Sequence, residues 1–370
     1  MVFPRCLTLF FSITLSVLCS LRPTNALASS RSSLPYNNGA VSIKDEQITL
    51  PNGLKAQVLS AVPPGDKSLS RKPPILFLHG SFHGAWCWQE KYMPFFVEEG
   101  HPCVAFSWRG TGGTPPEEGV SKVRVVEDHC ADLQGLLDSL PSILGSSDNS
   151  NSNDDRLRPI VVSHSMGGVV VMKFLDEMAG RKKPNELFSG IVSMCSVPPS
   201  GNSKTTMRYL RRSLLDTYKI TVGFVLKKVI TDDTICRDCF FGGRKQVLED
   251  GTMDNLGISD QDLARYQSYF ERDTKTILDV VDLNKCVPSK TADSEGKAPF
   301  LADLPPCLVV GADGDFIVDE VANLETATYY GVGRPLYVDS PHDIMLGRKW
   351  RNGADALNEW IHETFTVYKG

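Results

Sequence analysis

Ser165 is the residue in this chain whose setting most clearly suggests chemistry. A β-branched run, Val161-Val162, leads into the turn 163–168, which reads SHSMGG, and an apolar stretch with helical character follows at 169–178. A serine on such a tight strand-to-helix turn exposes its hydroxyl beside a helix N-terminus, where developing negative charge is favoured. The pattern therefore predicts a serine nucleophile. Ser163 replaces the first glycine of the usual G-x-S-x-G pattern, and its small side chain can fit the turn.

A serine nucleophile needs a base and an acid, and candidates for both follow it in the sequence. The apolar strand 307–311 ends in a turn that carries Asp313 and Asp315, and a later apolar segment leads to His342. A neutral imidazole can accept a proton near pH 7 and return it to a leaving group, so His342 is the predicted general base. The acid that orients this ring is predicted to be one of the two aspartates.

A third motif lies upstream of the turn 163–168, which we call the elbow. The buried-strand run 74–78 ends at the string HGSFHGAWCW, residues 79–88. Gly80 permits a close approach of the backbone. We assign Trp86 and Trp88 to the core as anchors of the helix that follows.

These motifs together resemble the α/β-hydrolase superfamily, and its plant esterase-type members most of all. The resemblance covers about residues 45–368 and includes the order Ser, Asp, His along the chain. It implies that Asp315 rather than Asp313 is the acid, because Asp315 is followed by an apolar run like that of the family's acid turn. It also implies an oxyanion hole formed by the backbone N–H groups of Ser81 and Met166. The motifs that carry it are HGSFHGAWCW, SWRGTGGT (107–114), the elbow, GADGDFIVD (311–319) and PHDIMLGRKW (341–350).

The resemblance implies a serine hydrolase that cleaves a carboxylic ester through an acyl-enzyme, with no cofactor and no metal. The substrate is expected to be a small, hydrophobic ester, with Phe82, His83 and His164 as substrate-binding residues. Two other classes share the fold: a hormone-receptor-like binding protein and a hydroxynitrile-lyase-like enzyme. A serine at position 165 argues against epoxide hydrolase and dehalogenase chemistry, in which an aspartate is the nucleophile.

Composition agrees with one catalytic domain. The 370 residues are 41% hydrophobic and carry a net charge of −5, so the chain can bury a large core and has no basic footprint for nucleic acid. The paired cations at 211–212 and 227–228 are predicted to be solvated faces first, and peripheral membrane contacts second. Cys236 and Cys239 are interpreted as a local disulfide or as plain packing, because neither a second CxxC nor a histidine cluster indicates zinc.

The expected fold is α/β, with a mostly parallel sheet covered by helices on both faces. A hairpin is predicted at 46–62, and a helical cap is predicted to interrupt the alternation at about 198–305, with helical stretches at 206–218 and 260–270. Candidates to line the substrate pocket within the cap are Met207, Tyr209, Leu210, Phe224, Tyr266 and Phe270. The further strands are expected at about 75–79, 103–107, 159–163, 190–195, 307–311 and 334–338.

The N-terminal 44 residues are interpreted as a targeting peptide and linker. They contain no acidic residue, Arg5 precedes an uncharged apolar run, and Ala26-Leu27-Ala28 resembles a cleavage site for small residues. These features fit a secretory signal peptide, and the Ser/Thr-rich, acid-free composition also fits a chloroplast transit peptide. The chain has no N-x-[ST] sequon, which favours the chloroplast over the secretory pathway.

Overall fold

The computed structural model describes residues 41–64, 72–145, 157–213, 218–242, 246–247, 253–254 and 257–366. The predicted targeting peptide, 1–44, therefore lies almost entirely outside the described residues. Within them, no helix combines the length and the apolar character needed to cross a bilayer.

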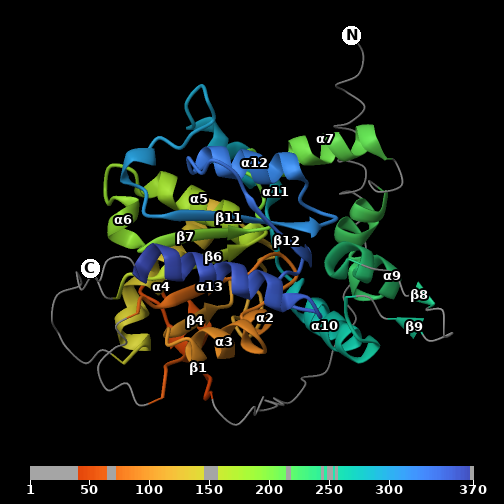
Figure 1. Ribbon diagram of the computed structural model, residues 1–370, viewed down its shortest axis with the longest axis horizontal. Coiled ribbons are helices and arrows are strands. Elements are labelled where there is room, and N and C mark those ends of the chain that lie inside the picture. Colours follow the sequence, from red (N-terminus) through yellow and green to blue (C-terminus); the bar gives the residue numbers. More distant parts are fainter. Residues whose placement is uncertain are drawn as a thin grey trace. The chain divides into compact units, whose positions relative to one another are not determined.

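An eight-stranded sheet forms the centre of the described region (Figure 1). Its order is β1-β2-β4-β3-β6-β7-β11-β12; the first two strands are antiparallel to their neighbours, and the other six run parallel. The predicted mostly parallel sheet is thus confirmed. The strands are β1 (Lys44–Thr49), β2 (Lys55–Ala61), β3 (Ile75–Leu78), β4 (Cys103–Phe106), β6 (Ile160–His164), β7 (Gly190–Met194), β11 (Cys307–Gly314) and β12 (Leu336–Pro341).

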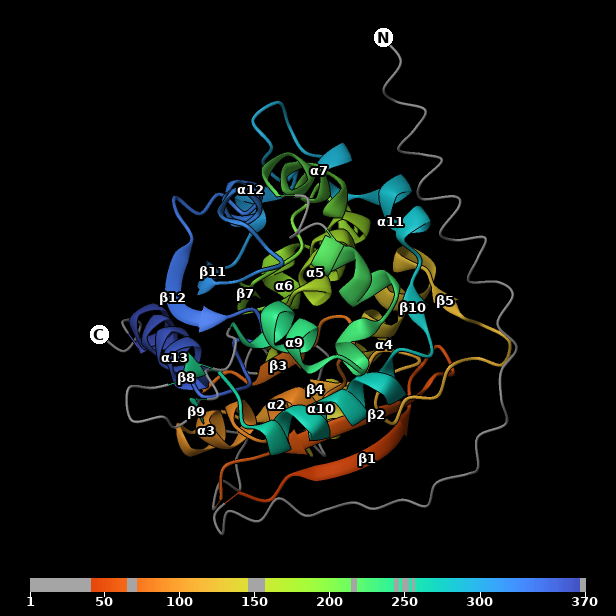
Figure 2. The same ribbon diagram turned by 90° about the vertical axis from the view of Figure 1, so that its right-hand side faces the viewer.

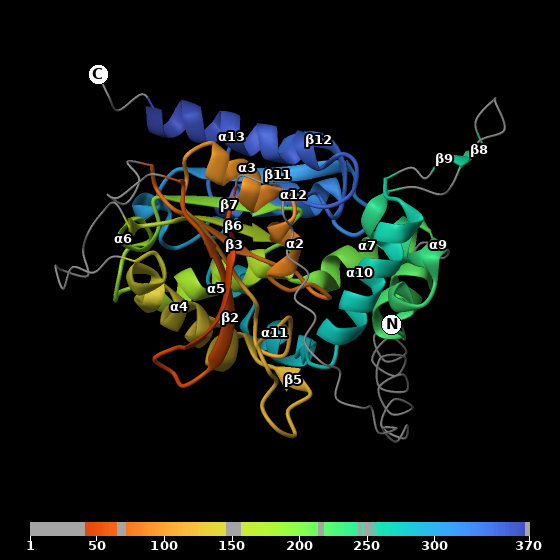
Figure 3. The same ribbon diagram turned by 90° about the horizontal axis from the view of Figure 1, so that it is seen from below.

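Successive residues of the central strands pack on opposite faces of the sheet. In β3, for example, Ile75 and Phe77 belong to one hydrophobic cluster, whereas Leu76 and Leu78 belong to the other. Both faces are apolar because helices cover both, as in other largely parallel sheets. Figure 3 shows α3 and α13 on one side of the sheet and α4 on the other.

The helices of the two covering layers are well defined by the same clusters. Side chains of α2, α3 and α13 pack in the first cluster, and those of α4, α5, α6 and α12 pack in the second. Their bounds are α2 (Trp86–Gln89), α3 (Tyr92–Glu98), α4 (Ala131–Ile143), preceded by the π-helix η1 (Val125–Cys130), α5 (Met166–Met178), α6 (Pro184–Leu187), α12 (Glu320–Tyr329) and α13 (Trp350–Thr366).

The stretch for which the sequence predicts a cap, 198–305, joins β7 to β11 and is mainly helical. Figures 1 and 2 show α9 and α10 beyond the ends to which β11 and β12 point. The helices are α7 (Asn202–Arg212), η3 (Thr221–Val225), η4 (Lys228–Ile230), α9 (Asp233–Cys236), η5 (Arg237–Phe241), α10 (Asp260–Asp273), α11 (Val280–Cys286), η6 (Pro288–Lys290) and η7 (Leu301–Asp303). Two short pairings accompany them: β8 (Gln246–Val247) with β9 (Met253–Asp254), and β10 (Ile277–Leu278) with β5 (Lys122–Val123).

Several element bounds differ from those expected, those of α7 and β12 among them. The helix expected at 206–218 is α7, which begins at Asn202 and ends at Arg212. The last strand, β12, ends at Pro341 rather than at 338. Its partner β11 continues to Gly314, where the pairing resumes with Pro341 after a shift in register beyond Ala312. That extension brings the end of β12 directly to His342.

Helix α10 is held against the core at its middle and at its end. In the middle of the helix, Tyr266 donates a hydrogen bond to Glu90 (Oη to Oε2, 2.8 Å), and Arg265 pairs with the same carboxylate. At its end, the carboxylate of Asp273 accepts from the indole Nε1 of Trp86 (2.7 Å) and from the backbone N of Gly112 (2.8 Å). The Asp273 side chain is fully buried, so these bonds form away from water.

We predict that Asp273→Ala lowers the free energy of unfolding by about 3 kcal/mol, because it leaves two half-buried donors, on Trp86 and Gly112, without this acceptor and removes the ion pair with Arg272. Glu271→Ala is the matched control: Glu271 is exposed on the same helix, and its loss should change stability by no more than about 0.5 kcal/mol. Urea denaturation measures both values. Equal midpoints for the two variants would contradict this account of how α10 is held.

Candidate active site

Ser165 lies at the junction of β6 and α5, in the strand-turn-helix geometry that its sequence predicts. Its backbone has φ 51° and ψ −117°, a conformation that residues with a Cβ seldom adopt. Such strain persists only where the surroundings hold it. Here a Cβ added to Gly80 would lie 2.7 Å from the Cβ of Ser165, and one on Gly167 would lie 2.9 Å from the carbonyl oxygen of His79. The turn thus requires small residues on both sides.

A continuous hydrogen-bonded chain connects Ser165, His342 and Asp315. Nε2 of His342 lies 3.2 Å from Oγ of Ser165, and Nδ1 lies 2.9 Å from Oδ2 of Asp315. Because a carboxylate only accepts, Nδ1 carries a proton, which leaves Nε2 of the neutral ring as the acceptor for the serine hydroxyl. This is the tautomer in which the imidazole can take the proton of Ser165.

Asp315 is held by its own turn. Its Oδ1 accepts from the backbone N–H groups of Ile317 (2.7 Å) and Val318 (2.9 Å), so the apolar run after the acid does fix the carboxylate. Cys195 follows β7 with a positive φ of 47°, and its Sγ lies within 4.8 Å of the same carboxylate; burial raises the pKa of this thiol well above the usual value. Asp313, by contrast, is exposed. The structure therefore brings Asp315, not Asp313, to His342.

The pKa of His342 reflects two opposing influences. Burial is the larger single influence and lowers the pKa, but the charge of Asp315, its hydrogen bond and the nearby charge of Asp343 together raise the pKa above its usual value of 6.5. The surroundings of His342 therefore favour the imidazolium, the form that a general base takes after accepting a proton.

The loop of Gly80 and Ser81 crosses close to the nucleophile. Nδ1 of His79 donates to the carbonyl oxygen of Gly80 (2.7 Å), and Nε2 accepts from the backbone N of Trp108 (3.1 Å). Burial lowers the pKa of His79 to about 3, so its ring is neutral, as this pairing requires. Since N–H and C=O point in opposite directions across a trans peptide, this bond also fixes the direction of the Ser81 N–H.

Met166, the other predicted oxyanion-hole residue, is the first residue of α5. The N–H groups of a helix's first turn have no partner inside the helix, which leaves that of Met166 available to a ligand. Participation of Ser81 and Met166 in an oxyanion hole stays a prediction.

Phe82, His83 and His164 surround this centre, and their substrate contact also stays a prediction. The His164 ring is fully buried and donates through Nε2 to the carbonyl oxygen of His342 (2.9 Å); burial lowers its pKa well below the usual value, so the ring is neutral. His83 is bonded at both ring nitrogens, to Ser81 and to Asp343. Both histidines thus support loops of the site in this structure.

An aromatic cluster from the predicted cap packs on Phe82. The ring centroids of Phe224, Phe240 and Phe270 lie 5.2, 6.1 and 6.5 Å from that of Phe82. The sequence does not single out Phe240, yet its ring centroid lies 6.2 Å from that of His342. Of the other candidates, Tyr266 is buried and bonded to Glu90, whereas Met207 is 36% exposed.

Trp86 differs from its expected role, whereas the cysteine pair takes one of the two roles expected for it. Trp88 is fully buried in the core, as expected, but Trp86 stacks on His83 and on Tyr266 and thus joins the loop after β3 to α10. Cys236 and Cys239 are free, buried thiols, so packing rather than a disulfide describes them.

Two groups of donor atoms among the described residues lie close enough to share an ion. They are His164, His342 and Asp343, and Cys195, Asp315 and His342. Both include His342, whose nitrogens already bond to Ser165 and Asp315. A metal bound in either group would therefore compete with the hydrogen bonds that join Ser165, His342 and Asp315.

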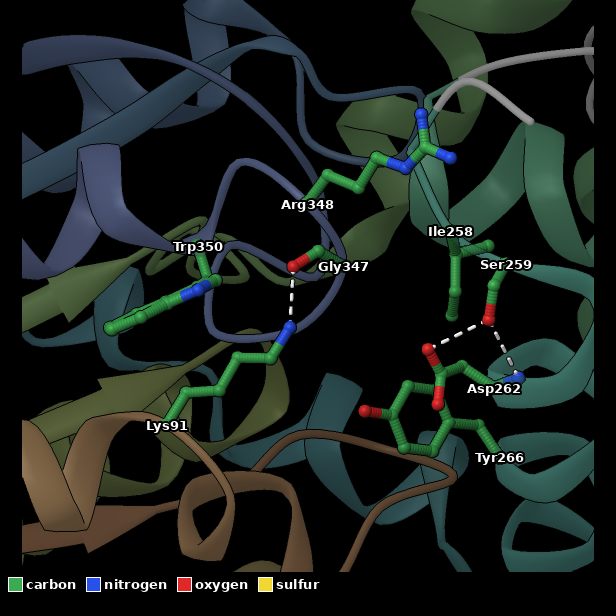
Figure 4. Close-up of a pocket in the computed structure, with 8 residues that line it drawn as sticks. All are labelled: Lys91, Ile258, Ser259, Asp262, Tyr266, Gly347, Arg348 and Trp350. Carbon is green, nitrogen blue, oxygen red and sulfur yellow. Dashed lines mark hydrogen bonds between the residues drawn. The ribbon is translucent and has the colours of Figure 1, made fainter. Parts of the chain in front are cut away.

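A separate cavity of about 210 Å³ lies where α10 meets the core (Figure 4). Lys91 donates to the carbonyl oxygen of Gly347 (2.6 Å) at one wall, and Ser259 caps α10 by accepting from the N–H of Asp262 (3.0 Å) at another. These polar groups bond to one another. The cavity is lined by Lys91, Ile258, Ser259, Asp262, Tyr266, Gly347, Arg348 and Trp350, none of them in the Ser165 chain.

The chain is similar in sequence to plant methylesterases and in fold to several solved hydrolase structures. Methylesterase 4 of Arabidopsis thaliana is 31% identical over 100 residues, which is 27% of this chain and 32% of that protein. The matched region thus spans about a third of the relative. Among solved structures, 2-hydroxy-6-oxo-6-phenylhexa-2,4-dienoate hydrolase from Rhodococcus superposes with a TM-score of 0.52 at 18% identity, covering 88% of this chain and all of the other.

A further solved structure, a mutant epoxide hydrolase from Solanum tuberosum, has a TM-score of 0.54 at 13% identity over 87% of this chain and all of the other. At these identities the structures show the fold alone. The sequence model described as "Alpha/beta hydrolase family" matches residues 75–348, well over half of the chain. The region that it matches includes the elbow, the acid turn and His342, and the chain belongs to the alpha/beta hydrolase family.

Proposed function

We propose that this protein is a serine hydrolase that cleaves a carboxylic ester through an acyl-enzyme. The observation that carries the proposal is the hydrogen-bonded chain from Asp315 through His342 to Ser165 at a strained turn. The similarity to a methylesterase supports an ester as the substrate, although it covers only part of each chain.

The geometry suggests how the reaction proceeds. Oγ of Ser165 attacks the ester carbonyl carbon while Nε2 of His342 takes the hydroxyl proton. Asp315 then stabilises the imidazolium. The N–H groups of Ser81 and Met166 would bind the oxyanion, each contributing about 3 kcal/mol to the transition state. His342 returns the proton to the leaving alcohol, and water attacks the acyl-enzyme by the same route in reverse.

The aromatic surroundings of the site support a hydrophobic ester. Phe82, Phe224, Phe240 and Phe270 form an apolar wall beside His342, and such surfaces favour apolar groups by removing them from water. Both the acyl part and the alcohol of the substrate are open to test. A panel of methyl esters with aliphatic and aromatic acids, together with one series of longer alcohols, would define them, and a cyanohydrin in the same panel tests the lyase alternative.

Ser165→Ala is predicted to abolish labelling by a fluorophosphonate and to lower esterase activity by a factor on the order of 10³ or more, because the attacking oxygen is gone. Ser163→Gly is the matched control, since it changes a buried hydroxyl of the same turn to the family's usual glycine and should keep labelling. Labelling that persists in Ser165→Ala would show that another residue reacts.

Asp315→Asn should lower kcat by a factor on the order of 10²–10⁴, because an amide favours the wrong tautomer of His342. The pH profile provides a second measure. A protonated ring cannot act as a base, so kcat/KM of the wild type should fall with falling pH through an apparent pKa above 6.5. The variant's profile should shift to lower pH, because burial of the ring then outweighs the remaining charge of Asp343. Asp313→Asn, at the exposed acid, is the control; a larger loss there than in Asp315→Asn would reverse the assignment.

We further propose that the N-terminal segment directs the protein to the chloroplast and is cleaved near Ala28. The support is the acid-free composition of residues 1–44 and the lack of sequons in a chain with many asparagines. A fluorescent fusion of residues 1–60 should enter plastids, and the N-terminus of the protein purified from its source should begin near or beyond Ala28. Import of the fusion into the endoplasmic reticulum would favour the secretory alternative.

A further inference from the structure

A second buried histidine–carboxylate pair lies beside the Ser165 chain. Nε2 of His83 lies 3.0 Å from Oδ2 of Asp343, and the two side chains are 1% and 0% exposed. Asp343 is the neighbour of His342 in sequence, and His83 lies two residues after Ser81. The pair therefore joins the loop of the predicted oxyanion hole to the loop of the predicted base.

The hydrogen bonds of His83 define its protons. Nδ1 lies 2.7 Å from the carbonyl oxygen of Ser81, and Nε2 lies against the carboxylate of Asp343. A carbonyl oxygen only accepts, so Nδ1 carries a proton, and one further proton lies between Nε2 and the carboxyl group of Asp343. Two buried ionisable groups are thus joined by a direct hydrogen bond.

The position of His83 leaves little room for substrate. Its ring stacks on Trp86 at a centroid distance of 5.5 Å and 22°, and the rings of Phe270 and Phe240 lie edge-on at 5.0 and 5.6 Å. Both nitrogens of His83 are bonded, and aromatic side chains cover its ring. His83 can therefore fix the position of the backbone and carboxyl groups to which it bonds. The group it holds most directly is the carbonyl of Ser81.

Hydrogen bonds from two histidines fix the backbone on both sides of Ser81. Nδ1 of His79 bonds to the carbonyl oxygen of Gly80, and Nδ1 of His83 bonds to the carbonyl oxygen of Ser81, both at 2.7 Å. The peptide groups on both sides of Ser81 are thereby fixed. The next residue, Phe82, has a positive φ of 70°, which residues with a Cβ adopt only when held.

Resting on the proposed function, we propose that His83 and Asp343 form a positioning pair for the oxyanion hole. His83 holds the Ser81 carbonyl through Nδ1, and Asp343 fixes His83 relative to the loop of His342. Asp343 also donates its backbone N–H to the carbonyl oxygen of Phe240 (3.0 Å), so the predicted cap is tied to the same point. Neither side chain contacts the reacting atoms.

Asp343→Asn and His83→Gln test the pair. Asn can still hydrogen-bond to the ring but cannot carry the charge of a carboxylate, so the bond that fixes His83 weakens, and with it the hold on the loop. With p-nitrophenyl acetate as substrate, each variant should lower kcat by a factor on the order of 10–10² and leave KM within about twofold, because a misplaced oxyanion donor weakens only the transition state. The double variant should lose no more than the larger single loss, since the two residues act as one unit.

Two further measurements separate positioning from a merely structural role. The inhibition constant of a trifluoromethyl ketone, which forms a tetrahedral adduct, should rise by the same factor as kcat/KM falls. His101→Gln is the matched control: His101 is equally buried, and its ring bonds to the carbonyl of Pro73 just before β3, at the end of the strand opposite to Ser81. It should lower the melting temperature without changing kcat.

Nitrogen-15 NMR of the histidine side chains tests the pair without any substrate. In the wild-type protein both ring nitrogens of His83 should show hydrogen-bonded signals, and Asp343→Asn should shift the signal of Nε2 more than that of Nδ1, which stays bonded to the carbonyl of Ser81. A raised KM with unchanged kcat would make His83 a substrate contact and overturn the proposal, as would variants that behave like His101→Gln. If the wild type neither cleaves esters nor reacts with a fluorophosphonate, the proposed function fails, and the NMR result alone then decides for or against the pair.

Discussion

The strained backbone of Ser165 is the constraint on which the rest of the site depends. A residue in such a conformation costs on the order of 1–3 kcal/mol, which the packing around it must offset. The core provides this packing through β6 and α5, whose residues are almost entirely buried. Glycines allow the close contact between the loop of Gly80 and the turn of Ser165. The order of the sheet places β6 between β3 and β7, so the turn emerges at the centre of the parallel strands.

Electrostatics divides the four histidines around Ser165 into two kinds. His79 and His164 lie next to acceptors on one side only, and burial lowers the pKa of each, so they remain neutral and fix backbone groups. His342 and His83 each face a buried carboxylate. A carboxylate removed from water is stable only when paired, and each of these two is paired with a ring that can carry the opposite charge. Charge is therefore available at His342, where the proposed chemistry uses it, and is absent from the rings of His79 and His164.

Much of the fold follows from local pattern. The short apolar strands, the turn at Asn52-Gly53 and the elbow appear within a few residues of their expected places, because alternating burial and turn chemistry are local properties. The same holds for Asp315, whose turn is fixed by the apolar residues that follow it in sequence. Local pattern could not assign roles to Cys195, Asp273 or Asp343, since their partners lie about 120, 160 and 260 residues away and only the fold brings them together. The one local signal for Asp343 is an acid directly beside the predicted base and followed by the buried run Ile344-Met345-Leu346.

The division between core and predicted cap explains why the fold alone does not choose a substrate. The groups proposed for bond cleavage come from strand ends of the sheet: Ser165 after β6, Asp315 after β11 and His342 after β12. The aromatic rings beside them come largely from 198–305, where Phe224, Phe240 and Phe270 belong to three separate helical segments. A change in those segments can reshape the apolar wall while the sheet keeps the serine, acid and base in place. Asp273 and Asp343 both bond this stretch to loops of the core. The same contacts therefore position the aromatic rings and the reacting groups. A change in these contacts would affect substrate specificity and the geometry of the site together.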